Sequence, residues 1–121
     1  MYSRSVALNE DQFKLRITQG IQSSQPLHKR VPVRDEEGKF LSDFMILVAG
    51  FRNWPGARQA EAVAKMQMVL GSFTEIVFAD LNVPLNLLWV SVRARQGVIV
   101  DIYSEFHGCI PEARIVGPYT P

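Results

Sequence analysis

The sequence predicts an α+β domain in which two helices pack on one face of an antiparallel sheet. The strand candidates are apolar at nearly every position, as in residues 44–49 and 74–79. Such runs indicate a sheet that is covered on both faces, because a half-buried strand alternates apolar and polar residues. Segments with helical spacing alternate with these strands, which gives the order β-α-β-β-α-β from residue 43 onward.

The chain separates into an N-terminal extension, residues 1–42, and an α+β domain, residues 43–121. The extension contains Ser23 and Ser24, a basic stretch at 28–30 and an acidic turn at 35–38. We expect it to be partly mobile or to pack on the sheet or on a partner. Within it, the alternation around Leu15 favours a strand, whereas Asn9 before two acidic residues favours a helix start, and the sequence leaves both readings open.

The first strand of the domain is predicted at residues 44–49 and the first helix from the loop 50–56 to about Leu70. The apolar residues of that helix follow helical spacing, and Gly71 ends it. A second strand covers 74–79, a hairpin loop 80–86, and a third strand 87–94.

Residues 97–109 have two readings. Val98 to Tyr103 has strand propensity after a Gln-Gly turn, but the apolar residues from Ile99 to Ile110 recur at helical spacing. We predict a helix, followed by a short last strand at 113–116.

The order of the elements resembles the ferredoxin-like fold, a two-layer sandwich with a four-stranded antiparallel sheet. In that fold both helices cover the same face, so the other face, which we call the open face, lacks a cover. The strands here are nevertheless apolar on both sides. We therefore predict a homodimer through the open face, and the predicted interface residues are Met45, Leu47, Val77, Leu87 and Trp89. A monomeric protein-interaction domain, whose open face receives a partner, is an alternative.

Three predicted loops meet at one end of the sheet, because the first two strands run parallel. Their polar side chains form a candidate site for a small anionic ligand, beside the start of the first helix. The candidate residues are Arg52, Asn53, Trp54, Asp80, Asn82, Asn86 and His107. The alternative, which we prefer, is that Asn53 caps the helix, Asp80 and Asn82 shape the hairpin and Arg52 is solvated.

The order of the elements is also similar to that of acylphosphatases, which implies a small hydrolase as an alternative function. In that reading Arg52 holds the phosphate and Asn82 orients water. The glycine-rich phosphate loop of that family is not matched by residues 50–56. We predict no catalytic residues, and a non-enzymatic module is the preferred reading.

Charge and cysteine content bound the remaining classes of function. Thirteen Lys and Arg against twelve Asp and Glu give no basic excess of the kind that binds nucleic acid. The single cysteine, Cys109, and only two histidines predict no metal site and no other cofactor. No apolar run is long enough to span a membrane, and we expect a cytoplasmic protein.

Overall fold

The computed structural model describes residues 15–19 and 41–116. The elements in chain order are β1 (Leu15–Thr18), β2 (Leu41–Val48), the 3-10 turn η2 (Phe51–Asn53), α2 (Gly56–Gly71), β3 (Ile76–Asn82), β4 (Leu87–Arg93), α3 (Val98–Cys109) and β5 (Ala113–Val116). The expected residues 97–109 helix is confirmed as α3, and Gly97, at a φ of 78°, turns the chain into it.

The five strands form one mixed sheet in the order β1-β3-β4-β2-β5. Strand β1 pairs in parallel with β3, and all the other neighbours are antiparallel. The prediction of a four-stranded, purely antiparallel sheet is therefore wrong. The difference arises because residues 15–18, which the sequence places in an extension, alternate apolar and polar side chains and supply a strand to the edge of β3.

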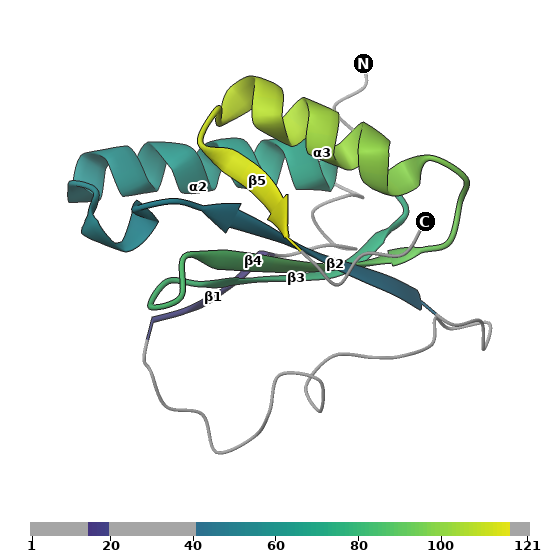
Figure 1. Cartoon of the computed structure of the whole chain (residues 1–121), viewed down its shortest axis with the longest axis horizontal. Coiled ribbons are helices and arrows are strands. Elements are labelled where there is room, and N and C mark those ends of the chain that lie inside the picture. Colours follow the sequence, from purple (N-terminus) through teal and green to yellow (C-terminus); the bar gives the residue numbers. More distant parts are fainter. Residues whose placement is uncertain (1–14, 20–40, 117–121) are drawn as a thin grey trace.

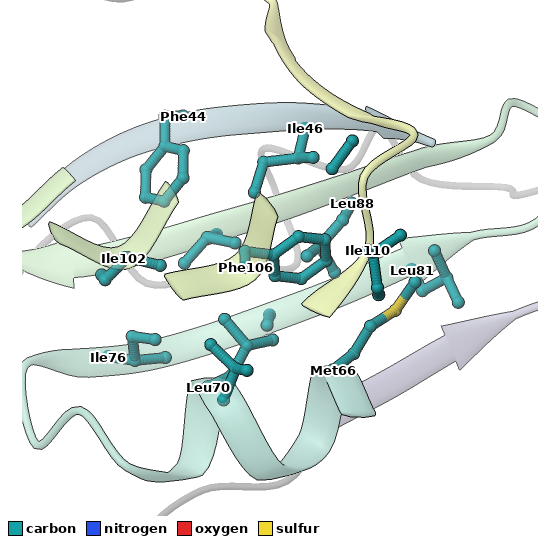
Figure 2. Close-up of a cluster of buried hydrophobic side chains, with 14 of the residues drawn as sticks. Phe44, Ile46, Met66, Leu70, Ile76, Leu81, Leu88, Ile102, Phe106 and Ile110 are labelled. Atoms are coloured by element: carbon teal, nitrogen blue, oxygen red, sulfur yellow. The ribbon is translucent and has the colours of Figure 1, made fainter. Parts of the chain in front are cut away.

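Both helices lie on the same side of the sheet (Figure 1). Between the two layers lies the core, to which β2, β4 and β3 contribute alternate residues. Phe44 and Ile46 of β2 face Ile102 and Phe106 of α3, as Figure 2 shows, and all four side chains are buried. Burial of side chains of this size contributes about 1.5–3 kcal/mol each, so this layer of apolar contacts is the main source of stability.

Helix α2 packs on the sheet through one apolar side. Ala62, Met66, Val69 and Leu70 are buried, whereas Met68 on the opposite side is 64 % exposed. This spacing of three and four residues is the pattern that predicted the helix. Neither helix of the described part of the chain is long and apolar enough to cross a membrane.

Strand β3 is longer at its C-terminal end than the sequence indicates. The predicted hairpin loop began at Asp80, but β3 continues to Asn82 and only Val83–Asn86 form the turn. Asn86 closes that turn with a φ of 58°, a conformation that asparagine tolerates better than most residues. Asp80 consequently lies within the sheet and not in a loop.

Candidate functional site

The open face, which is turned away from α2 and α3, carries two rows of side chains that run across the sheet. The strand registers define them. The first row is Arg114, Leu47, Leu87, Asn82 and Thr18, and the second is Val116, Met45, Trp89, Asp80 and Arg16. Each row is apolar at its centre, on β2 and β4, and polar toward β1.

Four of the five predicted interface residues form the centre of these rows. Met45 is paired with Trp89, and Leu47 with Leu87, across the β2–β4 ladder. All four are half-buried, in contrast to the fully buried Phe44 and Ile46 on the helix side. We call these four residues the apolar stripe. These four side chains are adjacent and lie on one face of the sheet.

The fifth predicted interface residue, Val77, lies at an irregularity of β3. The register shifts between Ile76, which pairs with Val92, and Phe78, which pairs with Ser91. Val77 is the extra residue at this point and is half-buried. A β-bulge of this kind locally twists the strand, and Val77 has no partner in the β3–β4 register that defines the two rows.

Asp80 is fully buried between β1 and β4. The Thr18 hydroxyl donates to both of its carboxylate oxygens, at 3.0 and 3.3 Å. In register, Asp80 stands beside Trp89, whose indole Nε1 is buried and finds no hydrogen-bond acceptor among the residues that the structure describes. Buried polar groups are usually paired, so this part of the open face contains one satisfied carboxylate and one unsatisfied donor.

A second polar pair lies one row further along the same face. The Ser91 hydroxyl, fully buried, donates to Asp43 Oδ1 at 2.7 Å. Asp43 itself is exposed. Thr18, Asp43 and Ser91 were not among the residues predicted for a site. Side chains alternate strictly along a strand, and this rule alone would have placed Asp43 on the same face of β2 as Met45 and Ser91 on the same face of β4 as Trp89.

The loop end of the sheet brings together three of the predicted ligand-binding residues. The Arg52 backbone amide donates to Asn86 Oδ1 at 2.7 Å, and its guanidinium donates to the Pro84 carbonyl at 3.1 Å. Asn82 Oδ1 accepts from the Leu85 amide at 3.1 Å. These bonds connect η2 to the β3–β4 hairpin. Each of the three side chains therefore stabilises the loops at this end of the sheet.

The other predicted ligand-binding residues lie apart from this cluster or make different contacts. Asn53 is exposed in η2. The Trp54 ring packs against Phe51, with centroids 5.4 Å apart, and Arg58 stacks 3.7 Å from its centroid. His107 is exposed on α3, and its ring is 5.7 Å from that of Tyr103 on the same helix.

Arg58 also pairs with Glu112, and together with Trp54 this pair borders a shallow cavity of about 170 Å³ between α2 and the α3–β5 connection. Cys109 and Lys65 line the same cavity. Within the described residues, no three His, Cys, Asp or Glu side chains are placed to hold a metal ion. Instead, the side chains around the cavity are stacked or ion-paired with one another. These contacts connect α2 to the segment that follows α3.

Neither the family models nor the curated proteins and solved structures compared with this chain contain a match.

Proposed function

We propose that the protein is a non-enzymatic binding module that acts as a homodimer, with the open face of the sheet as its interface. The observation that carries the proposal is the apolar stripe, four adjacent half-buried side chains on the face without helices. Apolar patches of this kind, bordered by polar residues, mark interaction surfaces. The residues that border the stripe are polar, namely Asp43 on β2, Arg114 on β5 and Asn82 on β3.

The size of the face limits how much of an interface it can supply by itself. Strands about 4.8 Å apart that rise about 3.3 Å per residue give the five strands a flat area of roughly 500 Å², and the part at Asp80 and Ser91 is already buried within the chain. Specific interfaces bury about 800 Å² per partner. A second copy of the chain supplies a surface of matching size and of the same apolar character.

We also propose that strands β2 to β5 with the two helices form a ferredoxin-like unit to which β1 is added. The order β3-β4-β2-β5 supports this, because β2 and β3 run parallel on either side of β4. The single cysteine, half-buried Cys109, fits a protein of the reducing cytoplasm.

The test is a pair of variants that place the same charge on the two sides of the molecule. Leu47→Glu puts a carboxylate in the apolar stripe, whereas Met68→Glu puts one on the exposed side of α2. We expect Leu47→Glu to have the mass of one chain in sedimentation equilibrium and to keep its helical circular dichroism. Met68→Glu is expected to keep twice the chain mass.

An unaltered chain that sediments as a monomer would contradict the homodimer and favour a monomeric module whose open face receives a different partner.

A further inference from the structure

Asp43 and Arg114 are two exposed, oppositely charged side chains that border the apolar stripe. Asp43 Oδ1 accepts from the Ser91 hydroxyl, and its second carboxylate oxygen makes no bond with a described residue. The Arg114 guanidinium makes no ion pair or hydrogen bond with a described residue. Both charges are therefore available to another molecule.

The two charges are too far apart to pair within one chain. Arg114 is level with Leu47, whereas Asp43 lies four residues away along β2. With about 3.3 Å per residue and about 4.8 Å between strands, their Cα atoms are about 14 Å apart. Side chains stand roughly perpendicular to a sheet, so an ion pair between these two positions requires a second copy of the chain.

The proposed homodimer, on which this inference rests, allows two directions for its twofold axis. A twofold interface uses the same patch on both copies, so the axis carries the stripe onto itself. Packed sheets keep their strands within about 30° of each other, so the axis runs either along the strands or across them. An axis along the strands lays β2 over the partner's β4, and Asp43 then lies about 16 Å sideways from the partner's Arg114.

An axis across the strands, at the centre of the stripe, reverses the order of the rows. Leu47 then packs on the partner's Met45, and the stripe of each copy covers that of the other. Asp43 comes to lie one strand and two residues from the partner's Arg114, which is about 8 Å sideways on the facing sheet. The long side chain of Arg114 spans that offset.

We propose that Asp43 of each copy pairs with the partner's Arg114, and that these two ion pairs set the axis across the strands. In this arrangement the Arg114 residues of the two copies are about 7 Å apart along the strands, so the Asp43 carboxylates also offset the repulsion between the two guanidiniums. Complementary charges of this kind fix the register of an interface.

Rescue of one neutral substitution by another tests the pair. Asp43→Asn keeps an acceptor for the Ser91 hydroxyl but leaves the two Arg114 guanidiniums without a counter-charge. We expect the dissociation constant, measured by sedimentation equilibrium, to rise about tenfold, and we expect the addition of Arg114→Gln to recover most of the affinity. Arg16→Gln is the matched control. Because β1 lies two strands beyond the stripe, this substitution should change the dissociation constant by the same factor with or without Asp43→Asn.

The outcomes separate the ion pair from the dimer itself. If Arg114→Gln changes the dissociation constant by the same factor in both backgrounds, in a chain that dimerises, the pair is overturned and the homodimer stands. A monomeric parent chain would contradict both. Each variant is expected to keep the helical circular dichroism of the parent, since Asp43 and Arg114 are exposed.

Discussion

At the scale of single residues, the carboxylate of Asp80 depends on one hydroxyl. Its side chain is fully buried and accepts only from Thr18 among the described residues. Thr18→Val keeps the shape of the side chain but removes the donor. We expect the free energy of unfolding to fall by about 1–3 kcal/mol, the cost of leaving a buried polar group without a partner. Urea denaturation measures it, and Thr18→Ser, which retains the hydroxyl, is the control expected to stay close to the parent.

The environment of Asp80 could not be predicted from the sequence. Asp80, Asn82 and Pro84 resemble turn chemistry when they are considered alone, so a hairpin loop was the reasonable interpretation. The strand continues because β1 supplies backbone partners to Ala79 through Asn82 and a hydroxyl to Asp80. That partner is more than sixty residues away in the chain, and local propensity carries no information about it.

At the scale of elements, an ion-pair cluster joins the start of β3 to the start of α3. Arg95 Nε donates to Glu75 at 2.7 Å, and its Nη1 lies 3.3 Å from Asp101. Partial burial raises the pKa of Glu75, but the hydrogen bond and charge of Arg95 outweigh it, and the net pKa lies below the ordinary value. The ionised form of Glu75 therefore stabilises the folded state.

The pH dependence of stability follows from that direction. The contribution of Glu75 is present above its pKa in the unfolded chain and is lost as the pH falls through its lower folded pKa. Glu75→Gln should be slightly less stable than the parent at pH 7, by an amount typical of an exposed ion pair. Thermal unfolding at neutral and acidic pH should show the difference shrinking as the carboxylate is protonated. A difference that persists unchanged in acid would show that Glu75 acts through packing and not through charge.

The elements that the sequence predicted well are those with a repeated apolar spacing. Residues 97–109 have the propensity of a strand and the apolar spacing of a helix. The i, i+3, i+4 spacing through Ile102 and Phe106 predicted the helix correctly, because both side chains face the core. Strand β1 is the opposite case. Its four residues alternate clearly, but a strand of this length is too short to be separated from a loop until its partner, β3, is known.

At the scale of the whole molecule, burial differs between the two faces of the sheet. On the helix side Phe44, Ile46 and Val48 are 0–1 % exposed, whereas Met45 and Leu47, between them in the sequence, are half-buried. The continuous apolar run in residues 44–49 predicted two covered faces. The structure accounts for one cover with α2 and α3 (Figure 1), and the homodimer is the proposed second.

The candidate surface was predicted more fully than the candidate loop site. Strand periodicity alone is sufficient to place Met45, Leu47, Leu87 and Trp89 on one face, because side chains alternate strictly along a strand. Loop residues follow no such rule. Arg52, Asn82 and Asn86 do meet, as parallel strand ends predict, but their hydrogen bonds and the separate position of His107 depend on side-chain geometry that spacing does not determine.

The most direct measurement is the mass of the unaltered chain in sedimentation equilibrium over the micromolar concentration range. A homodimer through the open face predicts twice the chain mass of 13.7 kDa, with dissociation to single chains on dilution. A mass of 13.7 kDa at every concentration would contradict it.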